Sequence, residues 1–230
     1  MTHSLVTGAN RGLGLEFVRQ LLARGERVIA TCRQPERAAE LTRLSGDYPG
    51  HLTVMPLALP DPRAIAALMR DIEALDSPVG CLINNAGMLV PDERYGSIEA
   101  NALQDSFAAN AQGPFLLTQA LAPRLSNGAR VLNISSGLAS IAGATSLFSP
   151  SYSISKAALN MATKLTSIAL ADRSIVVIAL SPGWVSTDMG GANASLTPTQ
   201  SITAMLRVID GLRIADSGRF LAHTGEPIDW

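Results

Sequence analysis

Short runs rich in β-branched residues alternate with longer helical patterns along the whole 230-residue chain. The runs predict strands over residues 4–6, 27–31, 52–57, 79–83, 130–134, 175–180 and 218–222. The helical patterns cover residues 15–23, 36–44, 62–75, 101–125 and 152–171. Strands that alternate with helices in this way form βαβ units around a parallel sheet. We therefore expect one α/β domain over residues 1–230, a doubly wound parallel sheet (Rossmann fold) with helices on both faces.

Composition and residue spacing exclude several classes of protein. The 18 Lys and Arg residues balance 19 Asp and Glu residues, whereas nucleic-acid binding needs a basic surplus. The chain has neither a run of about 18 apolar residues for a membrane span nor a signal-peptide layout at its start, so we expect a cytoplasmic protein. His3, His51 and His223 show no metal-ligand spacing, so no metal site is expected. Cys32 and Cys81 lie in apolar runs and are expected to be buried free thiols rather than a disulfide.

A glycine-rich segment lies directly between the first expected strand and the first expected helix. It reads Thr7-Gly8-Ala9-Asn10-Arg11-Gly12-Leu13-Gly14. In a doubly wound sheet such a turn lets the backbone approach a pyrophosphate and offers it the free N–H groups of a helix start. The alternative is a plain connection between a strand and a helix.

The residues around the second strand indicate which dinucleotide the chain binds. Many dinucleotide sites carry an acid about 20 residues after the glycines, which binds the ribose 2′-OH. Arg33 occupies that neighbourhood here, and Arg11 adds a second cation in the glycine segment. Two guanidinium groups fit a 2′-phosphate, which favours NADP(H) as the cofactor. The alternative is that both arginines are solvated surface residues.

Tyr152 and Lys156 are four residues apart and therefore share one face of the expected 152–171 helix. A nearby ammonium group lowers the pKa of a phenol from its usual value of about 10, which predicts a hydroxyl able to exchange protons near neutral pH. The same spacing also recurs by chance on exposed helices. Ser135 and Ser136 follow a strand, where a hydroxyl either bonds a substrate oxygen or simply ends the strand.

Asn110 lies in a helical pattern four residues before Pro114. Proline has no N–H to donate to the carbonyl of Asn110, so we expect a kinked helix and a free carbonyl at this point. Such a carbonyl either holds a functional water or simply faces solvent.

Taken together, these residues resemble the short-chain dehydrogenase/reductase family, most closely its C-factor-type and carbonyl-reductase-like members. The matching motifs are Thr7-Gly8-x-x-x-Gly12-x-Gly14, Asn84-Asn85-Ala86-Gly87, Asn110, Ser135-Ser136, Tyr152-x-x-x-Lys156 and Pro182-Gly183-Trp184-Val185-x-Thr187. They follow one another in order over residues 7–187. This resemblance implies the same doubly wound fold and a nicotinamide cofactor.

The resemblance also implies a role for each matching residue. Tyr152 is expected to be the catalytic acid/base, Lys156 to hold the nicotinamide ribose and tune Tyr152, Ser136 to orient the substrate oxygen, and Asn110 to hold a relay water. NADP(H) is expected to lie against Gly8, Asn10, Arg11, Gly12, Leu13, Gly14, Arg33, Leu59, Asn85, Ala86, Gly87, Tyr152, Lys156, Pro182, Gly183, Val185 and Thr187. The segment 184–196 is expected to cover the substrate.

Two departures from the family pattern affect this site. Ala58 stands where many relatives have an aspartate that binds adenine, so adenine recognition must rest on backbone groups or on Asp61. Ser136 lies 16 residues before Tyr152 (152 − 136), which is more than is usual in the family. The intervening 138–151 loop is therefore slightly long and is expected to shape the substrate pocket.

The function that this resemblance implies is an NADP(H)-dependent oxidoreductase that moves a hydride between the nicotinamide and a small carbonyl or alcohol substrate. One alternative is a C-factor-like regulatory or signalling protein that binds the cofactor with little turnover. Another is an isomerase or dehydratase of the longer related families, although only 43 residues (230 − 187) follow Thr187.

The resemblance further implies a homodimer. Relatives commonly pair the helices expected here at 101–125 and 152–171 about a two-fold axis. The second of these helices carries several alanines, which allow close approach of another helix: Ala157, Ala158, Ala162 and Ala169. The alternative is that these alanines only pack against their own sheet.

Overall fold

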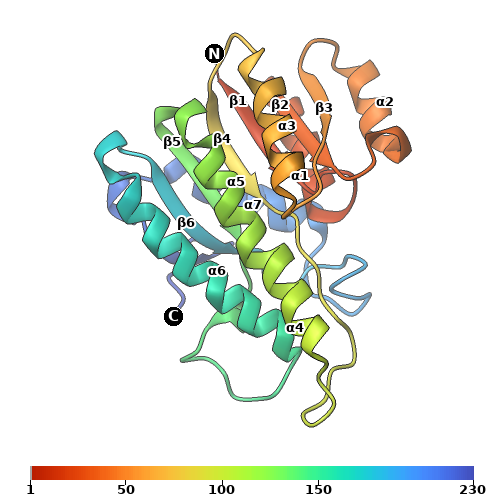
Figure 1. The fold of residues 1–230 in the computed structure, drawn as a ribbon, viewed down its shortest axis with the longest axis vertical. Coiled ribbons are helices and arrows are strands. Elements are labelled where there is room, and N and C mark those ends of the chain that lie inside the picture. The colour runs from red at the N-terminus through yellow and green to blue at the C-terminus, as the bar shows by residue number, and fades with distance from the viewer. Residues whose placement is uncertain (1) are drawn as a thin grey trace.

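The computed structural model describes residues 2–230 and contains a sheet of seven parallel strands (Figure 1). The strands are β1 (His3–Thr7), β2 (Arg27–Cys32), β3 (Leu52–Pro56), β4 (Val79–Asn84), β5 (Leu125–Ile134), β6 (Val176–Ser181) and β7 (Phe220–Ala222). Their order across the sheet is β3-β2-β1-β4-β5-β6-β7, which confirms the predicted doubly wound fold. The order reverses between β1 and β4, so the carboxyl ends of these two strands flank the crevice where such sheets bind ligands.

Helices cover both faces of this sheet. They are α1 (Gly12–Ala23), α2 (Ala39–Asp47), α3 (Pro62–Glu73), α4 (Ala100–Phe107), α5 (Gly113–Leu121), α6 (Pro150–Ala169) and α7 (Pro198–Gly211). Successive strand residues point to opposite faces: Val6 joins the core under α1, α2 and α7, whereas Leu5 joins the core under α3 and α5. On the second face α6 lies beside α4 and α5 (Figure 1).

The sequence patterns missed helix α7, although its start carries a clear signal. Thr197 accepts a hydrogen bond from the N–H of Gln200, and the Gln200 side chain accepts one from the N–H of Thr197. This reciprocal pair is a capping box, and Pro198 occupies the first helical position that proline favours. The motif Thr-Pro-x-Gln at 197–200 therefore predicts this helix start once it is looked for.

The long helix expected over 101–125 is divided in the structure. Between α4 and α5 the chain forms a π-helical turn (Ala108–Gln112), and α5 ends in a 3-10 turn (Ala122–Arg124). The π turn ends two residues before Pro114, so at the place where a kink was expected the structure has a widened turn within a continuous helix. At the other end Pro123 cannot donate to the helix, and β5 begins at Leu125 instead of at residue 130.

The segment after β7 folds back along the outer edge of the sheet. Ala222 donates its N–H to the Glu226 carbonyl, and Ile228 donates to the Phe220 carbonyl. The Trp230 ring stacks on that of Phe220 at a centroid distance of 5.7 Å. The outer strand β7 and the returning segment, residues 226–230, are thus joined by backbone hydrogen bonds and by aromatic packing.

The two cysteines are free, as expected, and neither is a reactive thiolate. Cys32 and Cys81 are free thiols, and burial raises the pKa of both, so both stay protonated at neutral pH. Among residues 2–230, every helix is too short or too polar to cross a membrane.

Candidate active site

The glycine segment forms a tight turn between β1 and α1. Gly8 and Gly12 have positive φ angles of 63° and 54°. A side chain at Gly8 would lie 2.9 Å from the Ala86 Cα atom, and one at Gly14 would collide with the Gly8 carbonyl oxygen. Side chains at Gly8 and Gly14 would collide with neighbouring atoms, so the surface of the turn is formed by main-chain atoms. The turn also lies at the start of a helix, where free N–H groups are available.

The Asn84–Gly87 turn lies against the glycine turn, because β1 and β4 are neighbours. Thr7 Oγ1 accepts hydrogen bonds from the N–H groups of Asn85 and Ala86, both at 3.0 Å. The Asn85 side chain donates to the Thr7 carbonyl at 2.9 Å. A Cβ at Gly87 would lie 3.5 Å from Lys156 Nζ, so the missing side chain leaves room beside that ammonium group.

The two arginines that favour a 2′-phosphate are exposed at this edge of the sheet. Arg33 follows the end of β2 and forms no ion pair within the described chain. Arg11 Nη1 lies 3.2 Å from Asp188 Oδ2, which joins the glycine turn to the loop after β6. The sequence reasoning missed Asp188. No spacing rule connects residues so far apart.

Leu59 and Asp61 are placed at the start of α3. Asp61 Oδ1 accepts a hydrogen bond from the N–H of Arg63 at 2.9 Å and so caps this helix. This occupies one of the two oxygens of Asp61, which is one of the two alternatives expected for adenine recognition, beside backbone groups. Leu59 packs against Gly113 of α5, with its Cβ 3.0 Å from the position that a Gly113 Cβ would take.

Tyr152 lies in the first turn of α6 and is buried. Burial raises the pKa of Tyr152 to about 12, and the nearby Ser136 side chain acts in the opposite direction. The prediction that this pKa is lowered by Lys156 is wrong: burial raises it, and Ser136 is the group that acts against the rise. The Lys156 Nζ lies 5.6 Å from the ring centre. Ser135 points elsewhere: it is buried and donates to Asn160 Oδ1 at 2.7 Å.

Lys156 is almost fully buried, with only 4% of its surface exposed. Its ammonium group donates to the Ile134 carbonyl at 2.6 Å and forms no ion pair within residues 2–230. Burial lowers the pKa of Lys156 to about 8. A buried ammonium group with spare N–H donors beside a glycine-lined gap suits a hydroxyl-bearing ligand such as a ribose.

Asn110 lies in the π turn and ties three segments together with its side chain. Its Oδ1 accepts from the N–H of Met88, and its Nδ2 donates to the Met88 carbonyl, both at 2.8 Å. Nδ2 also donates to Ser155 Oγ at 2.9 Å. The amide is thus engaged with protein groups, and only the main-chain carbonyl of Asn110 is a candidate for the expected water.

The loop after β6 also comes close to the glycine turn. Thr187 Cγ2 lies 3.9 Å from the position that a Gly12 Cβ would take. Val185 is buried and forms an isolated bridge with Leu196, so the two ends of the 184–196 segment pair with each other. Pro182 and Gly183 connect the carboxyl end of β6 to the 184–196 segment.

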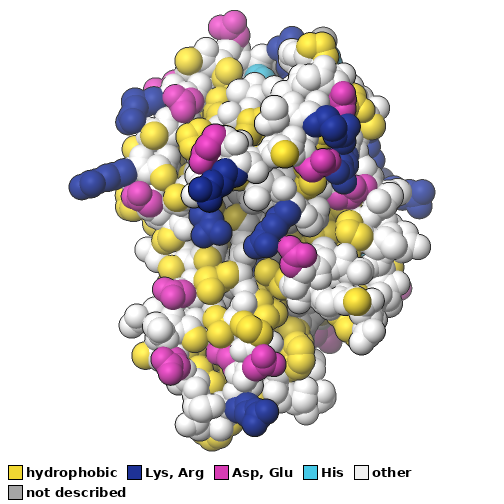
Figure 2. Space-filling view, turned by 90° about the vertical axis from the view of Figure 1, so that its right-hand side faces the viewer, with side chains coloured by type: hydrophobic (Ala, Val, Ile, Leu, Met, Phe, Trp, Pro, Cys, Tyr) yellow, Lys and Arg dark blue, Asp and Glu magenta, His cyan; other side chains and the backbone are white. Residues whose placement is uncertain are grey.

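Large hydrophobic side chains are exposed on the loops that follow the carboxyl ends of the strands. They are Tyr95, Leu138, Ile141, Leu147, Phe148, Trp184 and Met189. On one face of the molecule, hydrophobic side chains gather below a group of Lys and Arg side chains (Figure 2). From the sequence, only Leu138 of these residues is a candidate apolar wall of the substrate site, with ordinary core packing as the alternative, and 184–196 is expected to be a segment of small residues.

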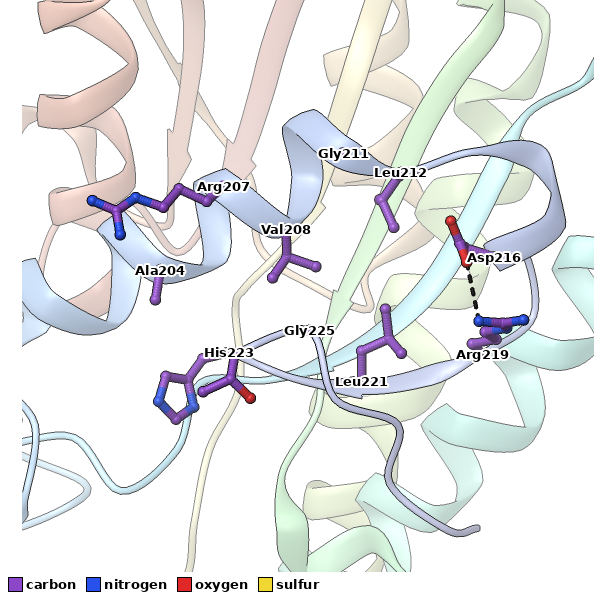
Figure 3. Close-up of a pocket in the computed structure, with 11 residues that line it drawn as sticks. Ala204, Arg207, Val208, Gly211, Leu212, Asp216, Arg219, Leu221, His223 and Gly225 are labelled. Carbon is purple, nitrogen blue, oxygen red and sulfur yellow. Dashed lines mark ion pairs between the residues drawn. The ribbon is translucent and has the colours of Figure 1, made fainter.

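A separate hollow of about 550 Å³ lies between α7 and β7 (Figure 3). Its apolar floor includes Val208 and Leu221, and the Asp216–Arg219 ion pair lies at one end. None of the predicted site residues lines it, so it is distinct from the edge that carries Tyr152.

The comparison with known proteins identifies the family. The short chain dehydrogenase model matches residues 2–196. The chain belongs to this family of oxidoreductases. It is 42% identical to the C-signal of Myxococcus xanthus over 155 residues, which cover 66% of this chain and 93% of that relative.

Two solved structures extend the similarity to the whole chain. The carbonyl reductase Sniffer of D. melanogaster is 33% identical, with a TM-score of 0.95 and full coverage of both chains. The NADPH-bound carbonyl reductase from chicken fatty liver is 38% identical with a TM-score of 0.93, covering 100% of this chain and 98% of that one. The predicted resemblance to carbonyl-reductase-like members is thereby confirmed.

Proposed function

We propose that this protein is an NADPH-dependent carbonyl reductase in which Tyr152 protonates the substrate oxygen. The observation that carries this proposal is that Tyr152, Ser136 and Lys156 lie together near the carboxyl ends of the strands. The Tyr152 hydroxyl lies close enough to Ser136 for that side chain to lower its pKa, and the buried Lys156 ammonium group lies beside the Tyr152 ring and next to Gly87. The NADPH in the chicken carbonyl reductase supports the choice of cofactor.

The residues present fit the diphosphate, the 2′-phosphate and the nicotinamide ribose of NADPH. The glycine turn would hold the diphosphate with backbone N–H groups, and Arg11 and Arg33 would bind the 2′-phosphate. Lys156 would donate to the hydroxyls of the nicotinamide ribose, and Thr187 would contact the nicotinamide end. When bound, NADPH supplies the hydride that reduces the carbonyl carbon.

Tyr152 is suited to the reducing direction. A pKa raised to about 12 keeps the hydroxyl protonated at neutral pH, so it starts the reaction as a proton donor. The Ser136 hydroxyl would donate a second hydrogen bond to the substrate oxygen and so stabilise the negative charge that develops on it. The Lys156 ammonium group would stabilise the phenolate that remains, and a water on the Asn110 carbonyl would return the proton.

The apolar rim indicates the kind of carbonyl compound that the site accepts. Trp184 and Phe148 are more than half exposed, which is costly unless a ligand covers them. Both lie on loops that follow strand ends beside Ser136. We therefore expect an uncharged ketone or aldehyde with an apolar body.

The experiment that tests this function follows NADPH oxidation with a panel of apolar, polar and charged carbonyl compounds. We expect turnover, with kcat/KM highest for the apolar compounds. The similarity to the C-signal favours one second candidate, a protein that binds the cofactor with little turnover. Tight NADPH binding without oxidation by any compound of the panel would support that candidate and overturn the reductase.

A further inference from the structure

The helix that carries Tyr152 and Lys156 begins without a cap of its own. Its N-cap residue, Ser149, has a left-handed backbone (φ 42°), and its side chain makes no capping hydrogen bond. Pro150 occupies the first helical position and has no N–H. The N–H of Ser151, one residue before Tyr152, is therefore the first donor of α6 that needs a partner.

That partner comes from a distant part of the chain. Glu93 Oε2 accepts hydrogen bonds from the N–H of Ser151 at 3.0 Å and from its hydroxyl at 2.8 Å. A carboxylate is well placed there, because the N-terminus of a helix carries partial positive charge. The Ser151 hydroxyl also accepts from Ser106 of α4 at 3.2 Å, and both serines are buried. Ser151 thus receives both contacts, from Glu93 of the loop and from Ser106 of α4.

The segment that ends in Glu93 is tied at both of its ends. At its start the main chain of Met88 is bound by Asn110, which also donates to Ser155 one turn along α6. At its end Glu93 holds Ser151. The two ties therefore hold the first two turns of α6, on either side of Tyr152.

We propose that Glu93 is a positioning residue for carbonyl reduction, which sets the Tyr152 hydroxyl beside Ser136 by capping α6 through Ser151. This inference rests on the proposed role of Tyr152. A misplacement of about 1 Å at a reacting group costs on the order of a hundredfold in rate. Loss of the cap should therefore lower kcat, whereas cofactor binding by the glycine turn should not change.

Three variants test this role by steady-state kinetics and NADPH titration. Glu93→Ala removes the acceptor, and we expect kcat to fall about ten- to a hundredfold with an unchanged NADPH dissociation constant. Glu93→Gln keeps an oxygen for Ser151 and is expected to restore most of kcat. Glu99→Ala is the matched control, since Glu99 lies in the same loop and its side chain caps no helix.

Hydrogen exchange tests the contact without relying on catalysis. The Ser151 amide should exchange faster in Glu93→Ala than in wild type and should stay protected in Glu93→Gln. Wild-type kcat in Glu93→Ala, or equal losses in the Ala and Gln variants, overturns the proposal. If Glu93→Ala does not fold, Glu93→Asp replaces it, because the shorter side chain withdraws the acceptor and full kcat there has the same meaning. A wild-type protein that reduces no carbonyl compound overturns the proposed function instead, and the exchange data still decide the contact.

Discussion

At the scale of single residues, burial acts on Tyr152 and Lys156 in the same physical way and with opposite direction. It raises the pKa of the phenol to about 12 and lowers the pKa of the ammonium group to about 8. Both shifts favour the neutral form, because desolvation penalises charge. The lysine is therefore the member of the pair that titrates closest to physiological pH.

This lowered pKa predicts a dependence of stability on pH. Between about pH 8 and 10.5 the unfolded chain binds a proton at Lys156 that the folded chain has lost. The free energy of unfolding should therefore rise with pH across this window, by on the order of 3 kcal/mol at most. Denaturant unfolding should show this rise in wild type and not in Lys156→Met. Identical pH dependence in both proteins would mean that the buried lysine stays charged.

Removal of the Tyr152 hydroxyl should abolish turnover and leave cofactor binding intact. Tyr152→Phe deletes the proton donor, while Lys156 can still bind the ribose. Acid–base catalysis contributes roughly 10²–10⁴-fold, so kcat should fall by at least the lower figure. Turnover assays and NADPH titration measure the two effects separately. A variant that keeps more than about a tenth of the rate is incompatible with this role.

Arg33 should set the preference for NADPH over NADH. Each charged hydrogen bond to the 2′-phosphate contributes roughly 1.5–3 kcal/mol, or about ten- to a hundredfold in affinity. Arg33→Asp replaces that attraction with repulsion and offers an acceptor to the free 2′-OH of NADH. NADPH affinity should fall at least about tenfold while NADH affinity holds or improves. Paired titrations check this, and an unchanged ratio would leave Arg11 as the only candidate of the two arginines.

At the scale of elements, helix α7 should depend on its capping box. Thr197→Ala removes the side-chain acceptor for the Gln200 N–H and should lower the free energy of unfolding by about 1 kcal/mol. Thr199→Ala, in the same turn but outside the box, is the control. Denaturant midpoints of the two variants provide the measurement. Equal midpoints would show that packing of α7 alone fixes its start.

The elements that sequence predicts well are those with a strong local pattern. All seven strands were predicted, since buried parallel strands are continuous apolar runs, as in 175–180. A kink was foreseen at the place of the π turn because Pro114 acts locally. Helix α7 was missed although its sequence carries two local signals, the capping box at its start and apolar residues at helical spacing: Ile202, Met205, Leu206 and Ile209.

The parts of the site that could not be predicted depend on contacts between distant residues. Glu93 lies 58 residues from Ser151, so only the fold reveals it as a cap for α6. The pairing of Arg11 with Asp188 is of the same kind. The direction of the Tyr152 pKa shift was wrong for a related reason, because the extent of burial is a property of the packed structure and not of the spacing to Lys156.

At the scale of the whole molecule, the outer face of α4, α5 and α6 should form a homodimer interface. Large apolar side chains are exposed along it: Phe107, Phe115, Ile154, Met161, Leu165 and Ile168. Wild type should sediment at twice 24.1 kDa at micromolar concentration. Leu165→Arg should yield monomers, while Ile214→Arg, exposed elsewhere, should not. A single 24.1 kDa species for wild type would leave this apolar face without a partner.

The returning segment after β7 has a consequence for how copies of the molecule can meet. An uncovered outer strand displays rows of free N–H and carbonyl groups, and such a row is a template on which strands from other chains can build aggregates. Here Phe220 and Ala222 already have their partners in residues 226–228, and the Trp230 ring packs over the same place. The sheet therefore cannot grow across β7 from one molecule into the next. In a crowded solution, residues 226–230 therefore protect strand β7 from pairing with strands of other molecules.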